Sequence, residues 1–272
     1  MSNRARVAGG PAVPLLGPGE PPAVEVVNPG GRAPLVLICD HASRRIPRAL
    51  DSLGLDRDSL KRHIAWDIGA ARVARRLSRR FDAPLVLSGY SRLVIDCNRR
   101  LADPTSIPAE SEDTMVPGNQ RVSRADARER ARTCFKPYHR AIVELLGAKL
   151  GAGLVPALVS VHSFTPVYHG ERRPWHVGVL WNRDPRIPVP LLAALRRRRG
   201  VVVGDNKPYT GRDRHGYSIE AHGARRGLPH ALLEFRQDLV EDAEGARRWA
   251  DLVGEALEDV LGDPGLYRVR RY

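Results

Sequence analysis

The stretch LVLICDHASRRIP, from Leu35 to Pro47, passes from an apolar run into an acid, a histidine and two arginines. An uninterrupted apolar run of this length predicts a strand that is covered on both faces of its sheet. The two residues that follow, Asp40 and His41, carry side chains that bind metal ions or move protons. The stretch therefore predicts a core strand that is followed, at its carboxyl end, by polar residues suited to a functional site.

Similar apolar runs recur along the chain and predict further strands at residues 85–87, 93–97, 157–161, 177–180, 201–203 and 231–235. Helical periodicity lies between several of them, at residues 68–77, 123–150 with an interruption at Pro137, and 246–261. Strands that alternate with helices predict a three-layer α/β/α fold with a mostly parallel or mixed central sheet.

The length of 272 residues and the hydrophobic content of 42% are enough for one domain with a sizeable core. Repeated Pro and Gly before Val24 predict that residues 1–23 form a flexible tail. We therefore expect a single domain over residues 24–272.

The chain is strongly basic, with 44 Lys and Arg against 31 Asp and Glu and a formal net charge of +13. Such a charge suits nucleic acids or small anions as partners. Aromatic residues make up only 6% of the chain, which is little material for stacking on bases. The short run from Arg196 to Arg199 is typical of a solvated helix end. These features weaken the nucleic-acid interpretation and leave a small anionic substrate open.

Three cysteines, Cys39, Cys97 and Cys134, stand without any CxxC spacing. They predict buried free thiols in a reducing compartment rather than a disulfide framework. No apolar run reaches transmembrane length, and Pro and Gly interrupt any signal-like core near the N-terminus. We therefore expect a cytoplasmic protein with no membrane partner.

Five predicted strands end in ionisable or amide side chains: Asp40-His41, Asp96 to Arg99, His162-Ser163, Asp205-Asn206 and Glu234 to Arg236. Ligands of open α/β sheets bind at the carboxyl ends of the strands. Five polar strand ends therefore predict a functional site at that edge of the sheet.

The two histidines at strand ends, His41 and His162, point to a metal when taken together, although one alone is more often structural. A catalytic zinc ion has three protein ligands and one open position. Asp67 is one candidate for the third ligand, but it also stands where an N-cap of the following helix is expected. Asp40 is the other, although neighbours on an extended strand point to opposite faces.

Glu234 interrupts an apolar run, where a carboxylate is costly unless it is paired or functional. One interpretation is an ion pair with Arg236, which lies on the same side of the strand. The other is a general base whose pKa is tuned by burial and by a nearby cation.

The segment YSRLVIDCNRR, residues 90–100, crowds Arg92, Asp96, Asn98 and Arg99 around one predicted strand. A guanidinium beside an amide is suited to gripping a carboxylate, because the guanidinium donates two parallel hydrogen bonds. Structural salt bridges on an edge strand are the alternative.

A series of motifs in fixed order resembles the N-formylglutamate amidohydrolase family: CDHASRRIP, RHIAWDIGA, YSRLVIDCNR, VHSFTP, RPWHVGVL, GDNKPY, HGYSIEAHG and LPHALLEFRQDL. The resemblance runs from about Val36 to Trp249. It implies a fold similar to that of zinc-dependent exopeptidases and amidases, and zinc-dependent hydrolysis of N-formyl-L-glutamate to formate and glutamate. The same fold on another N-acyl amino acid or peptide, and a basic nucleic-acid-binding protein, are the alternatives.

The resemblance also implies roles for individual residues. His41 and His162 match the zinc histidines, and Glu234 matches the catalytic glutamate. SRLVIDCNR is also similar to a segment of aspartoacylases and carboxypeptidases, which implies that Arg92 stabilises the oxyanion and that Asn98 and Arg99 bind the substrate carboxylate. Further candidates for contact with substrate are Arg173, Arg236 and His222.

One position departs from the carboxypeptidase-like pattern. Those enzymes have a glutamate three residues after the first histidine, where this chain has Arg44. Cell-wall amidases of related fold take a carboxylate from the start of the following helix, where Asp67 lies. The resemblance therefore favours Asp67 over Asp40, and over a purely capping role, as the third metal ligand.

Overall fold

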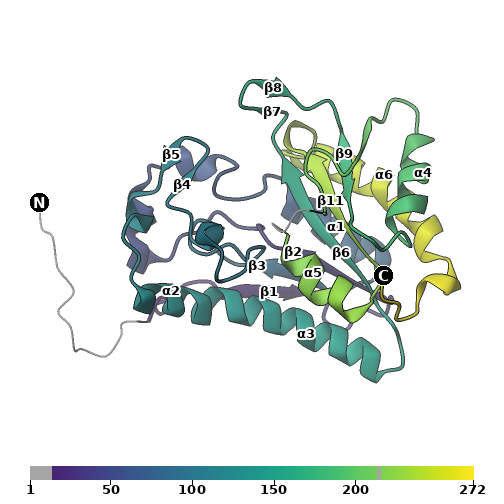
Figure 1. Cartoon of the computed structure of the whole chain (residues 1–272), viewed down its shortest axis with the longest axis horizontal. Coiled ribbons are helices and arrows are strands. Elements are labelled where there is room, and N and C mark those ends of the chain that lie inside the picture. The colour runs from purple at the N-terminus through teal and green to yellow at the C-terminus, as the bar shows by residue number, and fades with distance from the viewer. Residues whose placement is uncertain (1–13, 213–215) are drawn as a thin grey trace, which may run out of the picture.

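A seven-stranded sheet in the order β1-β3-β2-β6-β11-β9-β10 forms the centre of the protein (Figure 1). We describe a computed structural model that covers residues 14–212 and 216–272. The strands are β1 Val24–Val27, β2 Leu35–Cys39, β3 Leu85–Ser88, β6 Ala157–Phe164, β9 Val177–Leu180, β10 Val203–Asp205 and β11 His230–Arg236.

Four neighbouring strands, β3, β2, β6 and β11, run parallel to one another. β1 is antiparallel to β3 at one edge, and β9 is antiparallel to β11 near the other, with β10 parallel to β9. The sheet is therefore mixed with a parallel centre, and the carboxyl ends of the four parallel strands meet at one edge.

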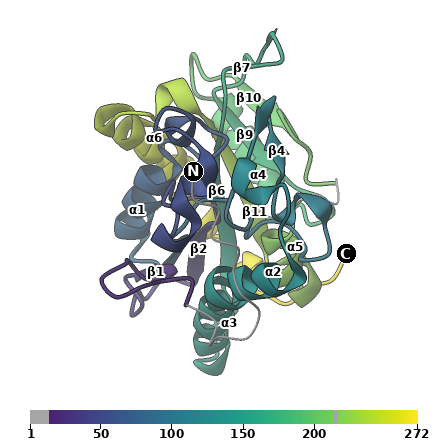
Figure 2. The same ribbon diagram turned by 90° about the vertical axis from the view of Figure 1, so that its left-hand side faces the viewer.

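Helices cover both faces of the sheet and complete the three predicted layers (Figure 2). The apolar side chains of α1, α4 and α6 share one core, and those of α3 with Ile219 of α5 share another. The helices are α1 Ala70–Phe81, α2 Arg124–Arg130, α3 Lys136–Gly151, α4 Pro188–Arg196, α5 Ser218–His222 and α6 Ala243–Leu261.

Alternation along the strands explains the continuous apolar runs. Leu35 and Leu37 of β2 pack into the core of α1 and α6, whereas Val36 and Ile38 pack toward α3. Each strand must therefore be apolar on both faces. The same alternation determines the face of the sheet on which each polar residue near the strand ends lies.

Short elements lie outside the main sheet. Two hairpins pair β4 Glu110–Ser111 with β5 Thr114–Met115, and β7 Val167–Tyr168 with β8 Glu171–Arg172. Short 3₁₀ segments occupy Arg48–Gly54, Ser59–Lys61, Pro104–Ser106, Pro117–Asn119, Ala224–Arg226, Gln237–Leu239 and Pro264–Leu266. β7 follows β6 almost directly, so this hairpin lies beyond the carboxyl end of β6.

The strand predicted at residues 93–97 is wrong, because this segment forms turns. Leu93 packs against Val116 in one small cluster under the loops, while Val94 and Ile95 pack in another. An apolar run can thus be buried on several sides without belonging to a sheet. The strand predicted at 201–203 is displaced, since β10 begins only at Val203.

The predicted helix over residues 123–150 is confirmed in outline but is divided. A π-helical turn, Ala131–Phe135, separates α2 from α3, and Pro137 follows in the first turn of α3, where a missing N–H is tolerated.

Part of the predicted flexible tail is packed instead. Leu15 is buried in a cluster with Tyr90, and the Tyr90 hydroxyl donates to the carbonyl of Pro21. Residues 1–13 of the predicted tail lie outside the described residues.

The three cysteines are buried and free, as predicted. Within residues 14–212 and 216–272, none of the helices combines the length and apolarity that a membrane crossing requires.

A substitution at Gly69, directly before α1, tests how closely the segment before that helix packs against the rest of the protein. Its φ is +82°, and a Cβ there would lie 2.2 Å from the carbonyl oxygen of Val240. We expect Gly69→Ala to lower the free energy of unfolding in urea by about 2–4 kcal/mol, through backbone strain and the clash. The control is Gly147→Ala in α3, where nothing lies within 4 Å and about 0.5–1 kcal/mol should be gained. Wild-type stability of Gly69→Ala would contradict this close fit.

Candidate metal centre and catalytic groups

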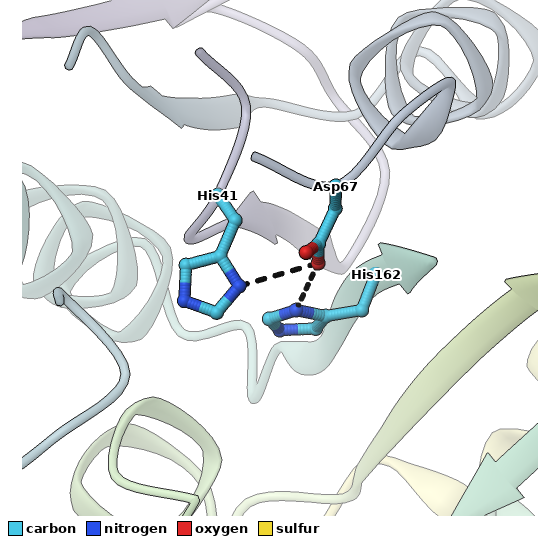
Figure 3. A group of neighbouring side chains, drawn as sticks. All are labelled: His41, Asp67 and His162. Atoms are coloured by element: carbon cyan, nitrogen blue, oxygen red, sulfur yellow. Dashed lines mark hydrogen bonds and ion pairs between the residues drawn. The ribbon is translucent and has the colours of Figure 1, made fainter. Parts of the chain in front are cut away.

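His41, Asp67 and His162 meet at the carboxyl end of the parallel strands, and all three are buried (Figure 3). Oδ2 of Asp67 lies 3.2 Å from Nδ1 of His41 and 2.8 Å from Nδ1 of His162. One ligand atom from each residue lies within 4.8 Å of the others. The three residues that the sequence suggested as metal ligands are therefore brought together.

The fold places these residues through strand neighbours and one backbone contact. His162 belongs to β6, and His41 lies just beyond β2, which pairs with β6. The backbone N–H of Asp67 donates to the carbonyl of His41 at 3.0 Å, which holds the segment before α1 against the strand end. The N-cap of α1 is Gly69, so Asp67 is not the helix cap that the sequence allowed.

Two further carboxylates hold the other nitrogen of each imidazole. Asp40 Oδ2 lies 3.0 Å from Nε2 of His162, and Asp96 Oδ1 lies 2.8 Å from Nε2 of His41. A carboxylate at the far nitrogen is the usual way in which proteins orient a metal-binding histidine. Asp40 therefore lies behind His162, whereas Asp67 lies where both Nδ1 atoms converge.

Asp40 is itself held in place by two hydroxyl groups. Ser160 Oγ donates to Oδ2 at 3.1 Å, and Ser218 Oγ donates to Oδ1. Ser218 begins α5, and the side-chain oxygen of Asn98 accepts from the backbone N–H groups of Tyr217 and Ser218 at 2.8 and 3.0 Å. The start of α5 is thus tied to the site through Asn98 and Asp40.

These contacts shift the pKa values of the buried groups in opposite directions. Burial opposes ionisation of Asp67, but His41 and His162 outweigh it and lower the pKa of its carboxyl. Burial alone would also raise the pKa of Asp40, which the His162 contact lowers to about 2. Burial lowers the pKa of His162, but Asp40 and Asp67 raise it well above the usual range.

The donor set fits a divalent metal ion. Two imidazole nitrogens and a carboxylate oxygen are ligands that zinc accepts, and tetrahedral bonds of about 2.0 Å separate neighbouring donors by about 3.3 Å. The two Nδ1 to Oδ2 distances of 2.8 and 3.2 Å are close to that spacing.

Glu234 lies beside this group on the neighbouring strand. It is in register with His162 in the parallel pairing of β11 with β6. Glu234 is only 6% exposed, and its Oε2 has no hydrogen-bond partner among the residues that the structure describes. Burial, together with the nearby Asp67, raises its pKa to about 7. A buried carboxylate with an unused oxygen beside a metal-type cluster is equipped to exchange a proton.

The alternative ion pair between Glu234 and Arg236 is not formed. The Arg236 guanidinium instead contacts Asp238 at 2.8 Å and donates to the carbonyl of Pro174. The Glu234 carboxylate is therefore not engaged by Arg236 and can act in the site.

Arg92 brings a positive charge to the same site. Its Nη2 donates to Asp96 at 2.9 Å, and its Nη1 lies 3.5 Å from Asp67. Burial lowers the pKa of Arg92, but the two carboxylates outweigh it and raise that pKa. Although residues 93–97 are not a strand, their turns still bring Arg92 and Asp96 to the metal-type cluster.

The remaining predicted residues lie around this centre in different settings. Arg99 donates from Nη1 to the carbonyl of Asn98 at 3.2 Å. Arg173 lies just beyond β8 and contacts Thr165 and Tyr209. His222 is buried and its Nε2 lies 2.8 Å from Nδ1 of His139, with the rings stacked.

Sequence reasoning missed three contributors: the orienting role of Asp96, Ser218 at the start of α5, and Tyr209 beside Arg173. Asp96 was noted only as part of a polar segment. Ser218 and Tyr209 lie in motifs quoted for the resemblance, but no strand end or periodic pattern marked them.

Comparison with known proteins places the chain in a family. A family model described as N-formylglutamate amidohydrolase matches residues 33–241. The chain belongs to the N-formylglutamate amidohydrolase family. No curated protein matches the sequence.

Two crystal structures extend the likeness over almost the whole chain. The gene product Atu2144 of Agrobacterium tumefaciens is 35% identical, with a TM-score of 0.88 over 91% of this chain and 98% of that one. An N-formylglutamate amidohydrolase of Ralstonia eutropha JMP134 is 19% identical, with a TM-score of 0.62 over 88% and 97%. The second likeness supports the fold alone.

The roles of Asp67 and Asp40 can be separated by zinc affinity, measured by competition with a chromophoric chelator. We expect Asp67→Ala, which removes a donor atom, to weaken binding more than 100-fold. Asp40→Asn, which keeps the three donor atoms but removes one buried charge and the partner that orients His162, should weaken it about 10- to 100-fold. The control is Asp58→Asn, an exposed residue paired with Lys61. A larger loss for Asp40→Asn than for Asp67→Ala would reverse the two assignments.

Proposed function

We propose that the protein is a zinc-dependent amidohydrolase that cleaves N-formyl-L-glutamate to formate and L-glutamate. The observation that carries the proposal is the Glu234 oxygen that has no partner among the described residues and lies beside the His41, Asp67 and His162 cluster. Membership of the family supports amide hydrolysis, and the name of the Ralstonia protein supports this substrate.

The ligands in this proposal are His41, Asp67 and His162, with Asp40 and Asp96 orienting the two imidazoles. When bound, a zinc ion would polarise the amide carbonyl and lower the pKa of a water molecule. Asp40, Asp67 and Asp96 bring three buried carboxylates to the site, and Arg92 compensates only part of their charge, so the site favours a divalent cation electrostatically.

Glu234 is the general base in this mechanism. Its ionised carboxylate takes a proton from the attacking water and returns it to the nitrogen of the leaving glutamate. A pKa raised to about 7 by burial allows both transfers near neutral pH. Arg92, fixed by Asp96 and Asp67, faces the negative charge that develops on the carbonyl oxygen.

The carboxylates of the substrate are assigned to Asn98, Arg99 and Arg173. The carbonyl oxygen of the Asn98 side chain is engaged with α5, so the amide nitrogen is the part suited to a carboxylate. Arg236 and His222 are weaker candidates, because Arg236 pairs with Asp238 and His222 with His139.

Formate release from N-formyl-L-glutamate by the zinc-loaded protein tests the proposal. We expect Glu234→Gln to lower kcat about 10²- to 10⁴-fold, because the proton acceptor is lost, while the zinc content stays unchanged. A chelator should abolish wild-type activity, and added zinc should restore it. Full activity in chelator with no metal detected would overturn the metal mechanism. Activity confined to another N-acyl amino acid would keep the chemistry and change the substrate.

The pH dependence tests the same residue. Glu234 accepts a proton only when ionised, so kcat/KM must fall as the pH drops through its pKa. Burial raises that pKa to about 7, and a bound cation would lower it again. We therefore expect an acid limb at or below about pH 7 in the wild type and in Glu144→Gln, whose exposed side chain pairs with Arg140. If the residual activity of Glu234→Gln shows the same acid limb, that limb reports the titration of another group.

A further inference from the structure

Arg173 lies between two tyrosine rings at the carboxyl end of β6. Its guanidinium carbon lies 4.4 Å from the ring centre of Tyr168 and 4.9 Å from that of Tyr209. Its Nη1 donates to the Tyr209 hydroxyl at 3.0 Å and to Thr165 Oγ1 at 3.3 Å. Thr165 follows β6, the strand that carries His162, so this cluster is attached to the strand of the metal-type site.

The loop that carries Tyr209 has a defined shape. The side-chain oxygen of Asn206 accepts from the backbone N–H groups of Trp181 and Gly211, at 3.0 and 2.9 Å, and so closes the loop between them. A Cβ on Gly211 would lie 2.7 Å from the nitrogen of Trp181, so only glycine allows this approach. Tyr209 is therefore held by the loop as well as by Arg173.

The same loop lies directly against the strand position next to Glu234. Gly178 of β9 is in register with Glu234. A Cβ on Gly178 would lie 2.0 Å from the carbonyl oxygen of Lys207 and 3.4 Å from Cβ of Glu234. The loop thus covers the catalytic strand pair at Glu234, and Tyr209 follows two residues after Lys207.

The environment of the Tyr209 hydroxyl agrees with this placement. Tyr209 as a whole is 45% exposed. Burial of its hydroxyl end and the nearby Glu234 nevertheless raise its pKa, against the influence of Arg173 and Arg92. The hydroxyl therefore lies within electrostatic reach of both Glu234 and Arg92, and it keeps its proton at neutral pH.

Tyr209 and Arg173 still have N–H and O–H groups that can donate hydrogen bonds to a substrate. Arg173 donates to the Tyr209 oxygen, so the hydroxyl proton can be given to a second acceptor. The side-chain bonds of Arg173 to other described residues use Nη1 alone, whereas a guanidinium carries five N–H donors. The Tyr209 hydroxyl and the free edge of the Arg173 guanidinium, both held in place by the contact between guanidinium and rings, can together donate hydrogen bonds to a carboxylate.

We propose that Tyr209 is a specificity-determining residue that, aimed by Arg173, donates a hydrogen bond to the side-chain carboxylate of the N-acyl amino acid. This inference rests on the proposed function and adds to it the group that separates an acidic from a neutral substrate. It assigns the side-chain carboxylate to Tyr209 and Arg173, which leaves Asn98 and Arg99 for the α-carboxylate.

The test compares N-formyl-L-glutamate with N-formyl-L-glutamine, which has the same length but no side-chain charge. With zinc-loaded protein, we expect the wild type to prefer the acid. Tyr209→Phe should lower kcat/KM for the acid about 10- to 100-fold, the usual effect of losing a hydrogen bond to a charged group. The loss should lie mainly in KM, and the amide substrate should change less than about threefold. Arg173→Gln should shift the preference in the same direction.

The matched control is Tyr168→Phe, the same chemical change on the other ring that covers Arg173. It should leave the ratio of the two substrates unchanged, and thermal melting should show that each variant folds. Equal losses on both substrates for Tyr209→Phe would place its hydroxyl at the reacting amide and overturn the inference. An unchanged ratio would overturn it as well. A wild type inactive on both substrates would instead refute the proposed function on which the inference rests.

Discussion

The Asp67 carboxylate, held between the Nδ1 atoms of His41 and His162, is the contact on which the rest of the site depends. Asp40 and Asp96 behind the imidazoles bring two more buried carboxylates, and Arg92 compensates part of their charge. Buried negative charge in excess is costly without compensation. Burial lowers the pKa of both imidazoles, but the neighbouring carboxylates outweigh it and raise that pKa, and a divalent cation would compensate the same carboxylates. The cluster could therefore hold a divalent metal ion.

The geometry of the sheet decides which side chains can take part. Alternation places Ser160 and His162 of β6 and Glu234 of β11 on the face toward α5, because Val159, Val161, Leu233 and Phe235 fill the core on the α1 and α6 face. One face thus carries the larger apolar core, and the other supplies Ser160, His162 and Glu234 to the site. α5 closes that side through Ser218, whose hydroxyl holds Asp40. The strands that carry the site therefore also carry the larger apolar core on their other face.

Much of this arrangement could be predicted from the sequence, because a strand covered on two faces has a continuous apolar pattern. The run 35–39 coincides with β2, and β6 and β11 extend their predicted runs by a few residues. The run 93–97 failed for a physical reason: loops can bury the same apolar residues in separate clusters. The choice between Asp67 and Asp40 depended on side-chain direction and on one backbone hydrogen bond, which composition and spacing do not encode. Tyr209 was missed because its position is set by loop closure at Asn206 rather than by a strand end.

Arg44 stands where the carboxypeptidase-like pattern has a glutamate, and the carboxylate of the cluster comes from another segment. Its side chain is exposed and lies over the ring of Trp66, at 5.6 Å from the ring centre, so the position three residues after His41 points away from the cluster. The carboxylate comes instead from the residue after Trp66, and the hydrogen bond from the Asp67 N–H to the His41 carbonyl brings the two segments together. Gly69 then allows the chain to turn into α1 against Val240. A carboxylate distant in sequence thus reaches Nδ1 of His41, because backbone contacts and the hydroxyl groups of Ser91 and Ser163 hold its segment.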